Sequence, residues 1–248
     1  MADKKTGLVI SVGKGGNRQV IQQAGPTIKI QGREVSPTAG RQIDLVFAID
    51  TTGSMSDKIE GLLATCNRFV DELAKLALAH RIAVIAFGDL TVPGDDITVF
   101  EFADDLSAVK KTLGSIPRYG GGGNEGESAL EAVEKALSLQ YRPGALKTLI
   151  LITDEPALQH RLKASDITHR LVQSEILTFV VSPDEAYYRA MAGKAGGTWY
   201  QVSAHTDFTG LLDMFKNLAA KLSSVVADVY RLGSGSVSRY LQLKAPDK

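Results

Sequence analysis

The feature that most constrains the fold is a series of apolar runs, each ending in a polar turn. The first run covers residues 43–49 and contains a single charged residue, Asp44. Nearly continuous apolar runs are typical of strands buried on both faces of a parallel sheet. Similar runs predict further strands at 82–87, 148–153, 176–181 and 198–202.

Between these runs, apolar side chains recur at the spacing of amphipathic helices, which predicts helices at 57–79, 106–113, 125–139, 165–174, 185–192 and 208–232. Because strands alternate with helices, we predict an α/β fold with a doubly wound, mostly parallel, Rossmann-like central sheet flanked by helices. A strand at 98–102 follows a link too short for a crossover helix, so it is expected as one antiparallel edge strand.

The length of 248 residues allows one sizeable domain with modest extensions. Residues 1–40 are rich in Gly, Gln, Lys and Thr and predict an N-terminal arm or small hairpin. The domain itself is expected at 41–232. A Gly- and Ser-containing remainder, 233–248, predicts a flexible tail.

Charge and cysteine content narrow the possible partners and the compartment. Basic and acidic residues number 28 each, and clustered excess base is missing, so no nucleic-acid partner is expected. No apolar run is long enough for a membrane helix, so no membrane partner is expected either. The single cysteine, Cys66, excludes an intrachain disulfide and fits a reducing, cytoplasmic location. Its apolar neighbours indicate a buried, unreactive side chain.

Oxygen-bearing side chains follow two of the predicted strands. Asp50, Thr52 and Ser54 come directly after the first run, and Asp154 follows the run at 148–153. Asn124 ends a glycine-rich loop before a predicted helix. Ligands of doubly wound sheets bind outside the carboxyl ends of the strands. Carboxylate, hydroxyl and amide oxygens together favour Mg²⁺, or alternatively Mn²⁺ or Ca²⁺.

The stretch from Asp50 to Ser54 resembles the Asp-x-Ser/Thr-x-Ser signature of von Willebrand factor A (VWA) domains, which opens their metal-ion-dependent adhesion site (MIDAS). The resemblance covers about residues 43–222. It implies that Asp50, Thr52 and Ser54 are metal ligands, that Asp154 matches a later family aspartate, and that Asn124 stands where a loop ligand is usual. Local sequence around Asp50, Gly121 and Asp154 is most similar to VWA domains associated with alpha-kinases, although no kinase signature is present.

The resemblance implies an intracellular protein–protein interaction module rather than an enzyme. An acidic residue of a protein partner would fill the open metal position. By analogy, the partner belongs to a multi-component assembly, such as one with an AAA-type ATPase, or to a signalling or stress-response system.

Other interpretations remain open from the sequence. The metal could instead support phosphoryl transfer or hydrolysis, or a metal-free scaffold could bind through the N-terminal arm.

The segment from Asp50 to Ser54 could be only a strand-to-helix turn with capping residues. Asn124 with Glu127 resembles a capping box, so Asn124 is either a ligand or a cap. Asp89 is interpreted as a turn residue. The glycines at 120–123 lack the lysine of a P-loop.

Overall fold

The computed structural model describes residues 28–30, 33–35, 42–74, 79–122 and 126–202, together with Ser224 and Asp228. The chain divides into two compact units, Met1–Ala39 and Gly40–Lys248. Within the first unit, β1 (Ile28–Ile30) pairs antiparallel with β2 (Arg33–Val35).

Parts of the predicted organisation lie outside the described residues. These are most of the arm at 1–40, the tail at 233–248, and the closing helix at 208–232 apart from Ser224 and Asp228, which are helical. The proposed division into the segments 1–40, 41–232 and 233–248 therefore stays a prediction.

The second unit contains a six-stranded sheet with the order β5-β4-β3-β6-β7-β8. Its strands are β3 (Gln42–Asp50), β4 (Ala79–Phe87), β5 (Ile97–Ala103), β6 (Leu146–Ile152), β7 (Ile176–Ser182) and β8 (Gly196–Gln201). All neighbouring strands are parallel except β4 and β5. The predicted fold class is confirmed, including the antiparallel strand at the sheet edge.

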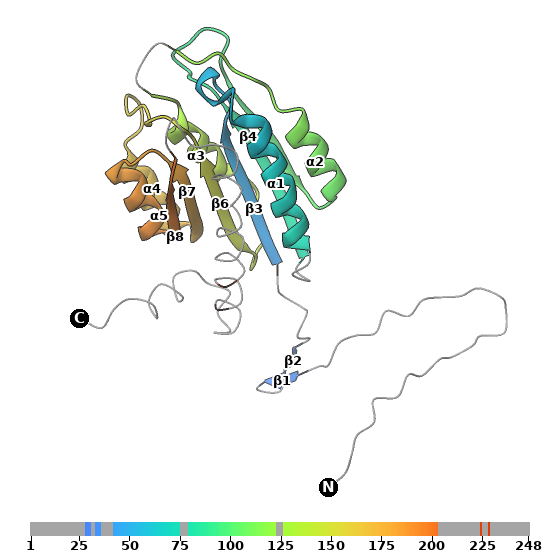
Figure 1. Cartoon of the computed structure of the whole chain (residues 1–248). Helices are drawn as coiled ribbons and strands as arrows, with labels where there is room; N and C mark the ends of the chain where they lie inside the picture. Colours follow the sequence, from blue (N-terminus) through green and yellow to red (C-terminus); the bar gives the residue numbers. More distant parts are fainter. Residues whose placement is uncertain are drawn as a thin grey trace, which may run out of the picture. The chain divides into compact units, whose positions relative to one another are not determined.

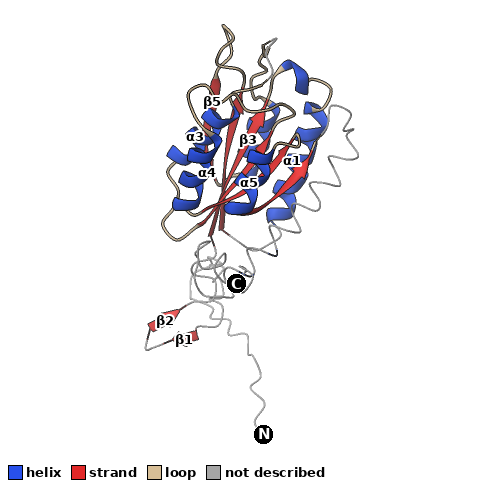
Figure 2. Ribbon diagram, turned by 90° about the vertical axis from the view of Figure 1, so that its left-hand side faces the viewer, coloured by secondary structure: helices blue, strands red, loops and turns tan. Residues whose placement is uncertain are grey.

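Helices cover both faces of this sheet (Figures 1 and 2). They are α1 (Ile59–Ala74), α2 (Leu106–Gly114), α3 (Ala129–Ser138), α4 (Ala164–Gln173) and α5 (Ala186–Lys194). Buried side chains of α1 and α2 form one core with the sheet, and those of α3, α4 and α5 form a second core on the opposite face. The sheet is thus the middle of three layers.

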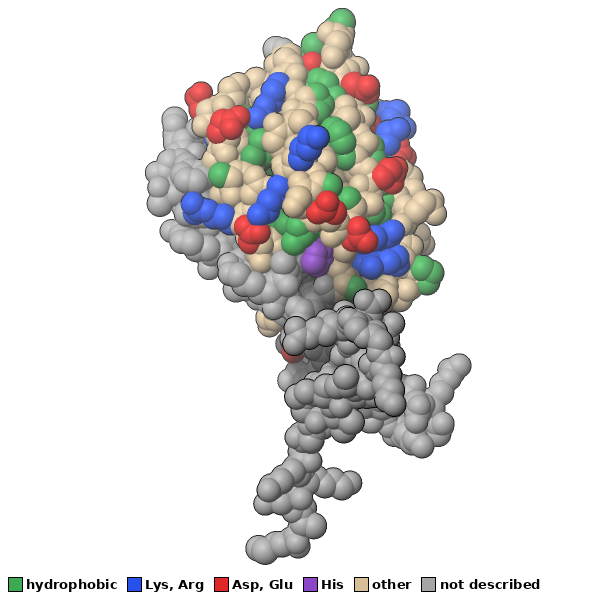
Figure 3. All heavy atoms as spheres, turned by 90° about the vertical axis from the view of Figure 1, so that its right-hand side faces the viewer, with side chains coloured by type: hydrophobic (Ala, Val, Ile, Leu, Met, Phe, Trp, Pro, Cys, Tyr) green, Lys and Arg blue, Asp and Glu red, His purple; other side chains and the backbone are tan. Residues whose placement is uncertain are grey.

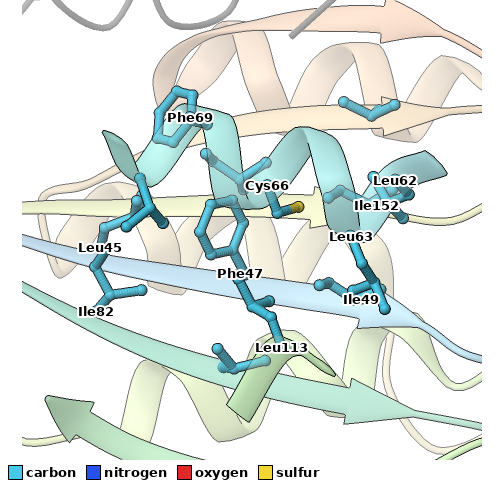
Figure 4. Packing of buried hydrophobic residues seen from close by; sticks show 14 of the residues in the cluster. Leu45, Phe47, Ile49, Leu62, Leu63, Cys66, Phe69, Ile82, Leu113 and Ile152 are labelled. Carbon is cyan, nitrogen blue, oxygen red and sulfur yellow. The ribbon is translucent and has the colours of Figure 1, made fainter. Parts of the chain in front are cut away.

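Strand β3 lies at the centre and contributes to both cores. Its odd-numbered residues Leu45, Phe47 and Ile49 face α1, as Figure 4 shows, whereas Val46 and Ala48 belong to the opposite core. Phe47 meets Phe69 of α1 edge to face, with ring centroids 5.8 Å apart. Burial on both faces explains why the sequence of this strand is apolar without alternation.

Cys66 belongs to the same core as Phe47 and is completely buried. Desolvation raises the pKa of its thiol well above the ordinary value, so the reactive thiolate is disfavoured. The interpretation of Cys66 as an inert apolar side chain agrees with this environment.

Two predicted helix boundaries were wrong. The helix expected at 57–79 is described only over Ile59–Ala74, and residue 79 already belongs to β4, because that strand pairs with β3 from Gln42 onward. The helix expected from residue 125 begins at Ala129, because Glu127 instead forms a parallel bridge with Ala157. In both places, pairing along the sheet or between loops overrides the local helical pattern.

Charged side chains of both signs are mixed on the surface. Figure 3 shows basic and acidic side chains interspersed on one face rather than gathered by sign. None of the helices in the described part of the chain is both long and apolar enough to cross a bilayer.

Asp44 is the charged exception within β3, at the end of the sheet opposite Asp50. Its carboxylate is fully buried and accepts hydrogen bonds from Arg81 Nε (3.1 Å) and Nη2 (2.7 Å), and from the backbone N and Nε of Arg142 (2.6 and 2.8 Å). Burial by itself would raise the pKa of Asp44, but the bonds from Arg81 and Arg142 outweigh it and hold that pKa below its ordinary value. These ion pairs of Asp44 with Arg81 and Arg142 lie at the amino-terminal end of β3.

We predict that Asp44→Asn lowers the free energy of unfolding by about 3 kcal/mol at pH 7, because it leaves two arginines without their buried partner. The pKa of Asp44 is lower in the folded protein than in the unfolded chain, where it is near 3.8. The charged side chain of Asp44 therefore stabilises the fold at pH values above 3.8, and this stabilisation is lost as the pH falls through the folded-state pKa. In urea unfolding between pH 7 and pH 3, the difference in stability between wild type and variant should therefore be constant above about pH 5 and become smaller towards pH 3. Asp71→Asn is the control, since Asp71 forms a more exposed pair with Lys110 and should cost less than about 1 kcal/mol. A constant difference across the pH range would contradict this account.

Candidate functional site

The candidate site lies where the winding of the sheet changes direction. From β3 the chain passes to β4 on one side, and later to β6 on the other. In doubly wound sheets, ligands usually bind at this switch point, outside the carboxyl ends of the strands. We call this part of the sheet edge, at the ends of β3 and β6, the crevice. Asp50 ends β3, and Asp154 follows β6 by two residues. The sequence prediction placed both residues at this edge, and the structure brings them to it.

Four oxygen-bearing side chains form a continuous chain across this crevice. Asp50 Oδ1 accepts from Thr52 Oγ1 at 2.6 Å, and Thr52 Oγ1 lies 3.1 Å from Ser54 Oγ. Ser54 Oγ in turn donates to Asp154 Oδ1 at 2.8 Å. Asp50 and Thr52 are buried whereas Ser54 is exposed, so the chain of oxygens reaches the surface at Ser54 before it meets the largely buried side chain of Asp154.

Thr153 fixes the inner end of this chain. Its hydroxyl donates to Asp50 Oδ2 at 2.6 Å, while the backbone N–H of Thr52 donates to Asp50 Oδ1 at 3.0 Å. Burial raises the pKa of Asp50 to about 6, even though the hydrogen bonds from Thr153 and Thr52 lower it, and the charge of Asp154 raises it further. Asp50 is thus a desolvated carboxyl group held in one orientation by donors from two strand ends.

The glycine-rich loop is attached to the turn after β3. The N–H of Gly53 donates to the carbonyl of Gly120 at 3.2 Å, and the N–H of Tyr119 donates to that of Thr51 at 3.0 Å. A Cβ built on Gly53 would lie 2.9 Å from the Gly120 oxygen, so any other residue would force these segments apart. Glycine at position 53 therefore permits the close approach of loop and turn.

Asp95 fastens the same loop from the other side. Its carboxylate accepts three backbone N–H groups, from Gly120 (3.0 Å, Oδ1), Gly121 (2.9 Å, Oδ2) and Asp89 (3.0 Å, Oδ2). The segment between β4 and β5 and the glycine-rich loop are consequently joined through one side chain. We call these three contacts the Asp95 clamp.

Glu127 is a second desolvated carboxyl group next to Thr52. It is 4% exposed, and its Oε2 has no hydrogen-bond partner among the described residues. A Cβ on Gly121 would lie 3.2 Å from Glu127 Oε1, so the glycine backbone, at φ +72°, closes over this side chain. Burial, together with the charges of Asp50 and Asp89, raises the pKa of Glu127 to about 8. A buried oxygen such as this Oε2 lowers the stability of the fold unless a hydrogen-bond donor or a ligand pairs with it.

The capping interpretation does not describe these residues. Ser54 directs its hydroxyl to Asp154, and Thr52 at the N-cap of the short 3-10 helix Gly53–Met55 makes no side-chain cap bond. The N-cap position of α3 belongs to Ser128, so the capping box of Asn124 with Glu127 is wrong. Asn124 itself lies outside the described residues, and its role as a ligand stays a prediction.

Asp89 agrees with its interpretation as a turn residue. Its Oδ1 accepts from the N–H and the hydroxyl of Thr91, at 2.8 and 2.7 Å.

The donor set can hold a hard cation through two carboxylates and two hydroxyls. The described residues contain no group of three or more His, Cys, Asp or Glu side chains arranged for a metal. Asp50 and Asp154 would therefore act with the hydroxyls of Thr52 and Ser54, and with water, which suits cations that accept mixed oxygen ligands.

The family model of the von Willebrand factor type A domain matches residues 44–217, well over half of the chain. The chain belongs to the VWA domain family. The predicted family is thereby confirmed, and VWA domains are protein-interaction and adhesion modules.

One relative of this VWA domain is an alpha-protein kinase. The alpha-protein kinase vwkA of Dictyostelium discoideum is 28% identical over 123 residues, which make up 48% of this chain and 19% of the kinase. The chain thus spans less than a fifth of that relative. Its name agrees with the local likeness to alpha-kinase-associated VWA domains.

Two solved structures share the fold. The pilus adhesin SpaC of Lactobacillus rhamnosus GG, in its open conformation, matches with a TM-score of 0.53 and 13% identity over 74% of this chain and 30% of the adhesin. BatB of Bacteroides thetaiotaomicron matches with a TM-score of 0.53 and 18% identity over 75% of this chain and 99% of BatB. At these identities the likeness concerns the fold alone.

Sequence reasoning missed several residues that build the site of this VWA domain. Thr153 had a signal, since a hydroxyl ending an apolar strand beside Asp154 faces the same crevice. Lys58 stands four residues after Ser54, a spacing that places the two close together at the start of a helix. Asp95 gave no signal, because its loop partners lie 25 and 26 residues further along the chain.

The Asp95 clamp leads to a prediction about the glycine-rich loop. In Asp95→Asn, one oxygen acceptor becomes an amide donor that faces backbone N–H groups. We expect amide hydrogen exchange of the peptide covering residues 117–122 to accelerate severalfold, and stability to fall by about 1–3 kcal/mol. Asp96→Asn is the matched control, because the Asp96 side chain accepts a hydrogen bond only from the N–H of neighbouring Ile97 among the described residues. Equal exchange in both variants would show that the clamp does not order the loop.

Proposed function

We propose that this VWA domain binds a divalent cation in the crevice between β3 and β6 and uses it to capture an acidic side chain of a protein partner. The observation that carries the proposal is the chain of oxygens from Asp50 through Thr52 and Ser54 to Asp154. A hard cation could bind among these oxygens by taking the place of their mutual hydrogen bonds, with the two hydroxyls keeping their protons.

The chemistry of the donors supports Mg²⁺, with Mn²⁺ and Ca²⁺ as alternatives. All the donors are oxygens, and hard cations prefer oxygen ligands. Asp50 would anchor the ion from the interior, with Thr52, Ser54 and Asp154 completing the protein ligands. Asn124 remains a proposed further ligand. Glu127 lies beside Thr52 with its buried Oε2 unpaired among the described residues, and a bound cation would favour the charged form of this carboxyl.

The exposure of Ser54 supports an external ligand. The oxygen chain reaches the surface at Ser54, so a cation bound beside Ser54 would keep positions for water or for a partner's carboxylate. A bound cation would supply electrostatic attraction for that carboxylate. Family membership supports a protein as partner, and we propose a cytoplasmic assembly, with an AAA-type ATPase or a signalling or stress-response system as the setting.

A binding role accounts for the site better than catalysis does. The Ser54 hydroxyl donates to Asp154 rather than to a histidine, so it lacks the base that activates a serine nucleophile. Asp50 is fully buried and both of its oxygens accept hydrogen bonds, from Thr153 and Thr52, so it is poorly placed to act as a general base towards a water molecule. We therefore propose an interaction module and not an enzyme.

The cation half of the proposal predicts metal-dependent stability. Thermal and urea unfolding are measured in EDTA and after adding Mg²⁺, Mn²⁺ or Ca²⁺. Wild type should gain about 2.7 kcal/mol at a hundredfold excess of ion over its dissociation constant, because only the folded chain assembles the site. Asp50→Asn and the exposed-site variant Ser54→Ala should gain much less. Asp166→Asn, in the first turn of α4, should respond as wild type does. An equal response of Asp50→Asn and wild type would refute this site.

The partner half predicts capture that needs both the cation and Asp50. The full chain, immobilised, is exposed to extract of the source cells in Mg²⁺ or in EDTA, and each captured protein is re-made with its exposed acidic residues replaced singly by alanine. Binding should be lost in EDTA, with Asp50→Asn, and with one specific acidic replacement in the partner. Capture that persists with Asp50→Asn would favour the metal-free scaffold instead.

A further inference from the structure

Lys58 places a positive charge directly on one of the proposed metal ligands. Its Nζ donates to Asp154 Oδ2 at 2.8 Å and to the backbone carbonyl of Ser54 at 3.2 Å. The side chains of Lys58 and Asp154 are only 10% and 4% exposed. This ion pair is therefore shielded from water, unlike the pair of Lys110 with Asp71, whose side chains are 36% and 54% exposed.

Both oxygens of Asp154 are engaged by this arrangement. Oδ1 accepts from Ser54 Oγ, and Oδ2 accepts from Lys58 Nζ. The surrounding acidic groups are Asp50, Glu127 and Glu155, of which Glu155 also responds to the charge of Lys58. Among the described residues, Lys58 is the basic side chain that forms an ion pair with an acid of this crevice. Its ammonium offsets part of the charge that would otherwise repel within it.

We propose that Lys58 is an internal competitor of the divalent cation: its ammonium neutralises Asp154 in the metal-free protein and must leave the carboxylate when the cation binds. The inference rests on the proposed cation site. Two positive charges sharing one shielded carboxylate repel each other strongly, because screening by water is weak there. The four-carbon stem of lysine allows the ammonium to move away into solvent.

This competition has two consequences of opposite sign. Removing the ammonium leaves Asp154 without its counter-charge, so the metal-free protein becomes less stable. The same change removes the repulsion against an incoming cation, so the cation binds more tightly. A lysine that merely formed a surface ion pair would produce neither effect.

The test compares Mn²⁺ binding to the full chain by isothermal titration calorimetry in wild type, Lys58→Met and Lys58→Arg. Methionine retains an apolar stem without charge, whereas arginine retains the charge. We expect Lys58→Met to bind Mn²⁺ roughly tenfold more tightly, and to unfold at a lower temperature than wild type in EDTA. Lys58→Arg should bind no more tightly than wild type. Lys110→Met is the control for loss of a lysine elsewhere and should leave Mn²⁺ affinity unchanged.

The outcomes separate this inference from the proposed function. Wild type that binds Mn²⁺ while Lys58→Met binds it equally or more weakly overturns the role of Lys58 and leaves the cation site standing. Neither protein binding Mn²⁺ overturns both. Tight binding that appears only in Lys58→Met supports the competition in its strongest form. If Lys58→Met fails to fold, Lys58→Gln, which is also uncharged and can still donate to Asp154, gives the same comparison.

Discussion

The structure depends on the burial of β3 between two helical layers and two parallel neighbours. Its side chains fill both cores, and its backbone pairs with β4 on one edge and β6 on the other. A strand held in this way has no freedom of register, since a slip of one residue would exchange the two faces. The position of Asp50 at its end is therefore fixed by apolar packing well away from the crevice. The rigidity of the site derives from the core.

The buried acids at the two ends of the sheet have different electrostatic environments. At the amino-terminal end, Asp44 is matched by Arg81 and Arg142, and the pKa of its carboxyl is held low. At the carboxyl end, Asp50 and Glu127 are desolvated beside other acids, which raises their pKa values. Stability alone favours the first arrangement. An acidic crevice that is only partly compensated is more typical of a functional site.

The fold and much of the candidate site could be predicted from the sequence because they depend on local patterns. Apolar runs gave the strands, and the short link before residue 98 gave the antiparallel edge. Asp50, Thr52 and Ser54 lie together in one turn, and Asp154 follows a strand whose position the winding rule supplies. The spacing of Asn124 and Glu127 suggested a capping box, but the backbone of Glu127 pairs with Ala157 in a parallel bridge, and the helix begins after it. Asp95 binds Gly120 and Gly121, 25 and 26 residues away, and the spacing of Lys58 from Ser54 does not reveal its ion pair with Asp154, 96 residues away, so no local pattern indicates these contacts.

The distance in sequence between the two halves of the crevice also affects how the protein is made. Asp50 meets Thr153 across 103 positions, and Ser54 meets Asp154 across 100. A chain growing from the ribosome completes β3 and β4 long before β6 is synthesised, so one edge of the central strand waits with its backbone N–H and C=O groups unpaired. Such edges invite pairing with other chains. The interval of synthesis between β4 and β6 is therefore the period in which this protein most needs protection from aggregation.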